Sequence, residues 1–127
     1  GRCQELAKGP LTGEREVWID GGHNPSAGEA MAEFWSNESL HVIIGMLANK
    51  NPDAIMEPMR PWCASVTVVP VPDHDWHPRE AFGREAKFAQ DLPSAMASLP
   101  KDQLPVFITG SLYLVGEALR LNDEIPT

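Results

Sequence analysis

The sequence lacks the long apolar segments that a membrane protein needs. No apolar run approaches the roughly 20 residues that a helix needs to cross a bilayer, and no apolar stretch follows the arginine near the start, as it would in a signal peptide. We therefore expect no contact with a membrane. Because the first residue is glycine rather than methionine, we also expect the chain to start inside a longer natural protein.

Cysteine and positive charge are scarce as well. Cys3 and Cys63 are far apart and have no C-x-x-C spacing, which argues against a disulfide framework and favours reduced thiols in the cytoplasm. The formal net charge of −8 argues against a nucleic-acid partner, because a protein that neutralises phosphates needs a basic patch. With 43% hydrophobic and 22% charged residues, the 127-residue chain has the composition of one folded domain.

Four short runs of apolar and β-branched residues predict buried β-strands. They are continuous rather than alternating, which is typical of strands whose sheet is covered on both faces. The runs lie at residues 17–19, 42–44, 66–69 and 106–109. Segments with helical spacing lie between them, and there is no internal repeat. This alternation predicts an α/β, Rossmann-like fold: a mostly parallel sheet of about five or six strands with helices on both faces.

The predicted helices have recognisable starts. The first has apolar residues at i, i+3, i+4, i+7 and i+8, namely Ala27, Ala30, Met31, Phe34 and Trp35. Asn24 is expected to cap it and Pro25 to occupy its first position. The second follows Asn51-Pro52 and should be bent or ended early by Pro58. Further helices are predicted over residues 80–87, 93–99 (after a short edge strand near Phe88) and 112–121.

Polar side chains follow three of the predicted strands. Asp20 ends the first strand and precedes Gly-Gly-His-Asn-Pro, Asn49 and Lys50 follow the second, and Ser111 follows the last. Ligands of open parallel sheets gather at the carboxyl ends of the strands, and the helix that starts after Asn24 offers an N-terminus to an anion. This edge therefore combines a carboxylate, an imidazole, an ammonium and a hydroxyl, which suits a phosphate or carboxylate ligand.

Each of these residues also has an ordinary structural role open to it. Asp20 could cap a turn, and His23 could be a capping or packing histidine. Lys50 could be a solvated loop lysine, and Ser111 could be the N-cap of the last helix. A binding site is favoured only because all of these residues are expected at the same edge of the sheet.

One other cluster of potential metal ligands stands out, at Asp73-His74-Asp75-Trp76-His77. Histidine and aspartate bind metals well, but this segment lies in a proline-bounded loop with no matching ligand pair elsewhere in the sequence. We therefore interpret it as a polar loop and predict no metal site.

Four segments, in order, resemble the signatures of folylpolyglutamate synthases. Residues 18–25 are similar to the family's Asp-Gly-Ala-His-Asn-Pro signature, with Gly22 where alanine is usual. Residues 44–50 resemble its Gly-Met-Leu-x-x-Lys stretch, and residues 109–116 match its Gly-Ser-Leu-Tyr motif closely. Gly1-Arg2 followed by Gln4 is similar to its Gly-Arg segment. The resemblance runs from the first residue to about residue 120.

This resemblance implies a function. The family is part of the Mur ligase superfamily, whose members use ATP to join an amino acid to a carboxylate through an acyl-phosphate intermediate. Residues 1–127 would be the C-terminal, glutamate-handling domain of a folylpolyglutamate/dihydrofolate synthase. Such an enzyme adds L-glutamate to folate or dihydropteroate and uses ATP and Mg²⁺, the latter held mainly by an N-terminal ATPase domain that this chain lacks.

The resemblance also assigns roles to individual residues. Arg2 would contact ATP phosphate, Asp20 the ribose hydroxyls, and His23, the one catalytic candidate, the phosphates or the incoming glutamate. The glutamate carboxylates would be held by Lys50 and Ser111, with Asn24 beside them. A cation suits a phosphate, a carboxylate accepts from hydroxyls, and an ammonium suits a carboxylate.

Two features depart from the complete enzymes of the family. The sequence has no G-x-x-x-x-G-K-[ST] and no Gly-Lys pair, so we expect the isolated chain to be inactive. The stretch before Asp20 looks longer than in many relatives, with residues 9–13 as the insertion. Two alternatives stay open: the C-terminal domain of a peptidoglycan Mur ligase, which His23 and the Gly-Ser-Leu-Tyr ending disfavour, and a non-catalytic nucleotide-binding or interaction domain. We expect a monomer.

Overall fold

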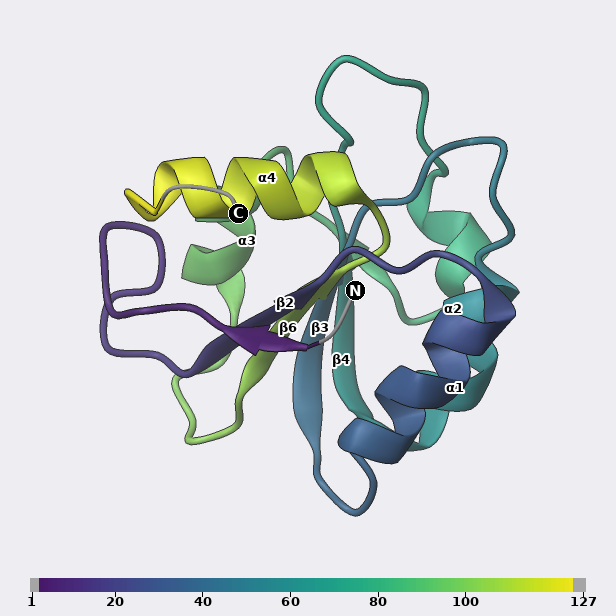
Figure 1. Cartoon of the computed structure of the whole chain (residues 1–127), viewed down its shortest axis with the longest axis horizontal. Helices are drawn as coiled ribbons and strands as arrows, with labels where there is room; N and C mark the ends of the chain where they lie inside the picture. The colour runs from purple at the N-terminus through teal and green to yellow at the C-terminus, as the bar shows by residue number, and fades with distance from the viewer. Residues whose placement is uncertain (1–2, 125–127) are drawn as a thin grey trace.

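A single mixed sheet organises the residues that the computed structural model describes, which are 3–124. Its strands are β1 (Gln4–Glu5), β2 (Val17–Asp20), β3 (Leu40–Ile44), β4 (Cys63–Val68), β5 (Lys87–Phe88) and β6 (Val106–Thr109). They lie in the order β1-β2-β6-β3-β4-β5. Every neighbouring pair is parallel except the edge pair β1–β2. The predicted α/β fold with a mostly parallel sheet is confirmed (Figure 1).

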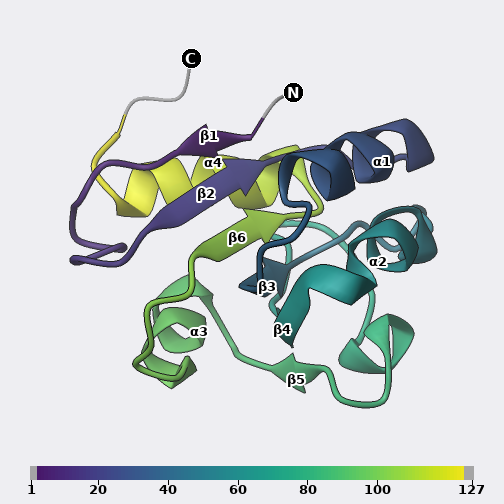
Figure 2. The same ribbon diagram turned by 90° about the horizontal axis from the view of Figure 1, so that it is seen from below.

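Helices cover both faces of this sheet. They are α1 (Pro25–Phe34), α2 (Asp53–Met59), α3 (Leu92–Ser98) and α4 (Leu112–Leu121). Helices α1 and α2 lie on one side and α3 and α4 on the other (Figure 2). Two 3₁₀ turns, η1 (Arg60–Trp62) and η2 (Arg79–Phe82), flank β4. Within residues 3–124, no helix has the length and apolarity to cross a membrane.

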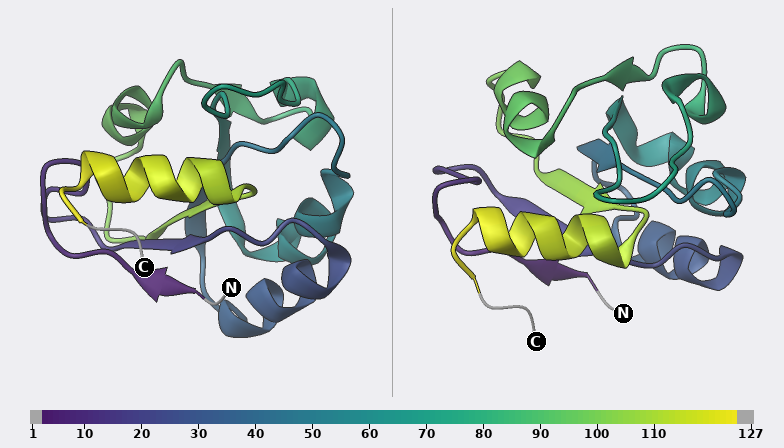
Figure 3. Two further views of the ribbon diagram at one scale, coloured as in Figure 1. Left: turned by 45° about the horizontal axis from the view of Figure 1, so that its top comes forward. Right: turned by 90° about the horizontal axis from the view of Figure 1, so that it is seen from above.

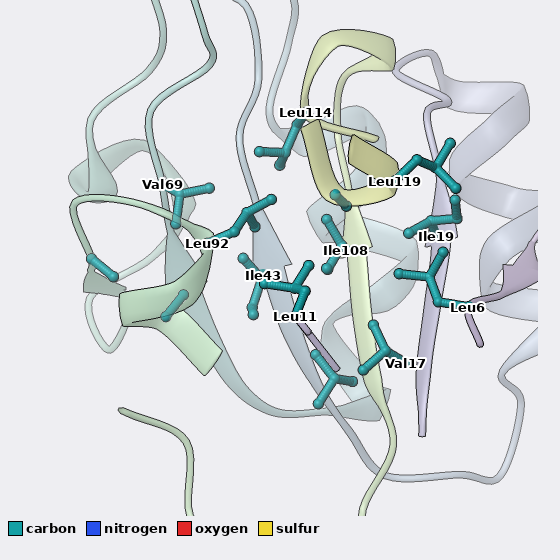
Figure 4. Close-up of a cluster of buried hydrophobic side chains, with 14 of the residues drawn as sticks. Leu6, Leu11, Val17, Ile19, Ile43, Val69, Leu92, Ile108, Leu114 and Leu119 are labelled. Atoms are coloured by element: carbon teal, nitrogen blue, oxygen red, sulfur yellow. The ribbon is translucent and has the colours of Figure 1, made fainter. Parts of the chain in front are cut away.

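The central strands β2, β3 and β6 are mostly apolar because their side chains alternate between two hydrophobic clusters. Ile19, Ile43 and Ile108 point toward α3 and α4, where Leu114 and Leu119 meet them (Figure 4). The intervening residues of the same strands, such as Val42 and Phe107, pack with α1 and α2. Successive side chains of a strand point to opposite faces, so a sheet covered on both sides needs apolar residues at every position.

Two of the helix predictions need correction. The predicted helix over residues 80–87 is wrong: the chain makes only the short turn η2, and Lys87–Phe88 is strand β5. The break comes at Gly83, whose φ of 114° is incompatible with an α-helix. In α1 the apolar stripe is narrower than predicted, because Ala30 and Phe34 are exposed and the buried face is formed around Met31.

The other helix predictions agree with the structure. Asn24 caps α1 through a hydrogen bond from the Ala27 N–H to its side chain. Helix α2 ends at Met59, one residue after Pro58, and continues as η1. Helices α3 and α4 lie where they were predicted, and α4 has the predicted bounds.

Close contact between α1 and α2 depends on Gly28. A Cβ atom on Gly28 would collide with the backbone oxygen of Ala54 in α2. We expect Gly28→Ala to lower the free energy of unfolding by about 1–3 kcal/mol, because the two helices must move apart. Gly116→Ala is the matched control: a Cβ there meets nothing within 4 Å, so better helix propensity should stabilise α4 by about 0.5–1 kcal/mol. Urea unfolding of both variants checks this, and equal effects would contradict it.

Candidate functional site

Three central strands end at the same level of the sheet. In the parallel register, Asp20 of β2 pairs with Thr109 of β6, and Thr109 pairs with Ile44 of β3. The loops after these strands therefore start side by side, as predicted. The chain leaves β2 for α1 on one face and β6 for α4 on the other. In open parallel sheets, ligands bind where the connections of neighbouring strands diverge in this way.

Asp20 is held firmly at the centre of this edge. Only 7% of its surface is exposed. Its Oδ1 accepts a hydrogen bond of 2.9 Å from the Gly22 N–H, and its backbone oxygen accepts one of 2.7 Å from the Thr109 hydroxyl. Asp20 therefore does cap the turn after β2, which was its structural alternative. The carboxylate still has lone pairs for a ligand, because each oxygen can accept more than one hydrogen bond.

A thiol that sequence reasoning missed completes the setting of Asp20. Cys3 donates from Sγ to Asp20 Oδ2 over 3.7 Å. Burial, the negative charge of Asp20 and this hydrogen bond together raise the pKa of Cys3 to about 12. The thiol therefore stays protonated at neutral pH and acts as a donor. No sequence signal points to this contact, because it arises from the antiparallel pairing of β1 with β2.

Ser111 and Asn24 both act as helix caps. The Ser111 hydroxyl oxygen accepts from the Tyr113 N–H over 3.0 Å, and Asn24 Oδ1 accepts from the Ala27 N–H over 2.8 Å. Ser111 is only 2% exposed, so its position is fixed. As an acceptor in the cap, its hydroxyl still has a proton to donate. Each residue thus has the structural role that the sequence allowed, at the edge where binding was predicted.

His23 contributes an imidazole to this edge, and Lys50 contributes an ammonium group. Both are half-buried, and within residues 3–124 neither side chain makes a hydrogen bond or ion pair. The backbone of Lys50, in contrast, makes two hydrogen bonds. Its N–H donates to Leu47 O over 3.0 Å, and its carbonyl accepts from His77 Nε2 over 2.6 Å. We call Asp20, His23, Asn24, Lys50 and Ser111 the carboxyl-edge site. Arg2 lies outside the described residues.

Four surface cavities lie away from the main residues of the carboxyl-edge site. These four of the cavities on residues 3–124 have volumes of about 370 to 850 Å³, and none of the four is lined by Asp20, Lys50 or Ser111. The same part of the chain contains no group of three or more His, Cys, Asp or Glu side chains that could hold a metal.

A second polar cluster, also missed from the sequence, lies at the opposite edge. His41 is the second residue of β3 and is 3% exposed. Its Nδ1 lies 2.6 Å from Ser65 Oγ, and its Nε2 lies 2.9 Å from Asp102 Oδ2. Arg15 also pairs with Asp102, at 2.6 Å. The hydrogen bond from His41 is the main cause that lowers the pKa of Asp102. Because this cluster joins the segments before β2 and β6, it stabilises the amino ends of the strands.

Comparisons with known proteins agree with the fold. No family model matches the sequence. The structure resembles that of Thermotoga maritima folylpolyglutamate synthase, with a TM-score of 0.78 and 24% identity over 97% of this chain and 30% of that one. It also resembles Mycobacterium tuberculosis folylpolyglutamate synthase complexed with ADP, with a TM-score of 0.80 and 23% identity over 96% and 34%. The fold matches the folylpolyglutamate synthase C-terminal domain.

The sequence comparison points to the same group of enzymes. Dihydrofolate synthetase of Saccharomyces cerevisiae is 23% identical over 133 residues, which cover 85% of this chain and 31% of the yeast protein. The chain thus spans about a third of the length of its relatives. It is similar in sequence and structure to one domain of folylpolyglutamate and dihydrofolate synthases.

The thiol beside Asp20 gives a prediction about reactivity. Only thiolate reacts with iodoacetamide, so in a Cys63→Ser background Cys3 should react far more slowly at pH 8 in the folded chain than in urea. Its rate should keep rising above pH 10, because a pKa of about 12 keeps the thiol protonated until then. Asp20→Asn removes a negative charge and should speed the reaction. Alkylation of folded chain at the unfolded rate, or indifference to Asp20→Asn, would contradict the contact.

Proposed function

We propose that residues 1–127 are the C-terminal domain of an ATP-dependent ligase that adds L-glutamate to folate or dihydropteroate through an acyl phosphate. The observation that supports this most is that β2, β6 and β3 end at the same level of the sheet, so that the loops carrying Asp20, Lys50 and Ser111 begin side by side. The sheet belongs to a fold that resembles folylpolyglutamate synthase. The relatives described above are folate enzymes, which favours folate over peptidoglycan chemistry.

Asp20 and His23 form the nucleotide side of the proposed site. The Asp20 carboxylate is fixed by Gly22 and Cys3 and can accept hydrogen bonds from the ribose hydroxyls. His23 lies just before α1, whose N-terminus favours negative charge, and would face the phosphates or the incoming glutamate as the catalytic residue. Arg2 would contribute a phosphate contact. The donors and acceptors that the chain presents here fit a nucleotide.

Lys50, Ser111 and Asn24 form the glutamate side. An ammonium and a buried hydroxyl suit a carboxylate, because charge-assisted hydrogen bonds are the stronger ones. Ser111 is fixed by its cap hydrogen bond, and the Lys50 backbone is fixed by its two hydrogen bonds. These residues would hold the amino acid so that its amine meets the activated carboxylate, which is catalysis by placement.

The other half of the site would come from the rest of the parent protein. One related bifunctional synthase has been solved with Mn, AMPPNP and L-glutamate bound. Residues 3–124 here contain no cluster of three metal-ligating side chains, so we assign Mg²⁺ mainly to an N-terminal ATPase domain that would close over the carboxyl-edge site. ATP bound there would supply the phosphoryl group that activates the acceptor carboxylate. The parent would be a monomeric cytoplasmic enzyme.

Separate substrate defects should follow from substitutions on the two sides of the site. In the full-length parent, Asp20→Ala should raise the KM for ATP by about one to two decades, since a lost charge-assisted hydrogen bond is worth roughly 1.5–3 kcal/mol. Lys50→Ala should raise the KM for glutamate and leave that for ATP nearly unchanged. Lys50→Arg should rescue only in part, because a guanidinium is larger and planar. Steady-state titrations of both substrates measure this; the same defect in both variants would refute the assignment.

The isolated chain should have neither ligase nor ATPase activity. It lacks a phosphate-binding loop, so nothing in it would cradle the transferring phosphoryl group. A coupled assay of ADP release by the purified 127-residue chain should match the assay blank. ATP hydrolysis that copurifies with the chain and is abolished by Asp20→Ala would contradict the proposal that the phosphate-binding loop of another domain is needed.

A further inference from the structure

The loop with the potential metal ligands, residues 73–77, crosses the loop that carries Lys50. We call residues 74–77 the strap. The Ala48 N–H donates to Asp75 O over 3.0 Å, and the His77 N–H donates to Met46 O over 3.1 Å. Leu47 and Trp76 form an antiparallel bridge between these bonds. Both loops project from the same end of the sheet (Figure 1), and the strap pairs with residues 46–48 as a short ladder outside the sheet.

The His77 side chain extends this ladder to Lys50 itself. Its Nε2 lies 2.6 Å from the Lys50 carbonyl oxygen, and because a carbonyl can only accept, Nε2 must carry the proton. The ring also packs edge-on against Phe82, at 6.4 Å between centroids. Phe82 is 1% exposed and belongs to the hydrophobic core, so the imidazole packs against the core. Together with the Lys50 N–H bond to Leu47 O, this contact fixes the Lys50 backbone from both sides.

The other end of the strap reaches the helix that begins after Ser111. The His74 ring stacks on Tyr113, with 4.0 Å between centroids and 24° between planes. Tyr113 lies in the first turn of α4 and donates its N–H to the Ser111 hydroxyl. Figure 3 shows the start of α4 beside the loops that follow β3 and β4. The strap thus contacts the loop that carries Lys50 and the first turn of the helix that Ser111 caps.

The geometry points to His77 as a positioning residue for glutamate recognition: it fixes the Lys50 backbone so that the ammonium stays within reach of the carboxylate that Ser111 also contacts. This inference rests on the proposed function of Lys50. A lysine side chain has four rotatable bonds, and ordering it on binding costs conformational entropy. Fixing the backbone of a mobile residue would cost conformational entropy in addition. The His77 hydrogen bond removes this backbone cost at Lys50, so it should affect glutamate binding and not nucleotide binding.

Two substitutions of His77 separate the hydrogen bond from the packing. In the full-length parent, His77→Phe keeps a ring against Phe82 and removes the donor, and we expect the KM for glutamate to rise roughly 3- to 10-fold. His77→Gln retains an N–H at similar reach and should stay within about twofold of wild type. The KM for ATP should change less than about twofold in both. Asp75→Asn is the matched control, since Asp75 contributes only its backbone oxygen to the ladder.

A double-mutant cycle with Lys50 decides between positioning and general structural damage. On a Lys50→Ala background, His77→Phe should add nothing further to the glutamate KM, because the two act through one contact. The inference would be overturned if the two substitutions had additive effects on the glutamate KM, or if His77→Phe raised the KM for ATP equally. It would also be overturned if His77→Gln raised the glutamate KM as much as His77→Phe does. If Lys50→Ala alone leaves the glutamate KM unchanged, the proposed role of Lys50 fails instead. If Lys50→Ala raises it and His77→Phe does not, only the role of His77 fails.

Discussion

Asp20, Thr109 and Ile44 are paired across three neighbouring parallel strands, and everything proposed for this chain depends on that register. A shift by one residue would turn the buried side chains of a strand to the other face of the sheet. Because both faces are covered, by α1 and α2 on one side and α3 and α4 on the other, such a shift would disrupt two hydrophobic clusters at once. The core thereby fixes the level at which the three loops begin, and with it the spacing of the polar groups.

The polar residues at this edge combine structural and binding roles. Asp20 caps a turn, and Asn24 and Ser111 cap helices. These roles do not compete with ligand binding. A cap hydrogen bond uses one lone pair of an oxygen and holds the side chain in a single rotamer. A ligand then meets a group that is already ordered, which lowers the entropic cost of binding. The same residue that ends a strand or starts a helix is therefore well placed for recognition.

The histidines show how position decides between chemically similar groups. His41 is buried at the amino ends of the strands, where it joins Ser65 to Asp102. His74 and His77 lie at the carboxyl ends, in a strap that contacts the first turn of α4 and the loop after β3. His23 alone precedes a helix N-terminus at the proposed nucleotide side. Four histidines in one sequence thus meet different surroundings, and composition gives no sign of which is which.

Local pattern predicted much of the fold, and it named the residues of the candidate site as a hypothesis. Continuous apolar runs identified four strands, because a sheet covered on both faces needs them, and Asn24 and Ser111 were recognised as caps from their neighbours. The helix predicted over residues 80–87 failed because apolar spacing does not report the left-handed φ of Gly83.

Only the tertiary structure brought Cys3 to Asp20, Asp102 to His41 and His77 to Lys50. These contacts join residues 17 to 61 positions apart. They depend on strand order and loop packing, and the spacing of residues along one segment carries no information about either.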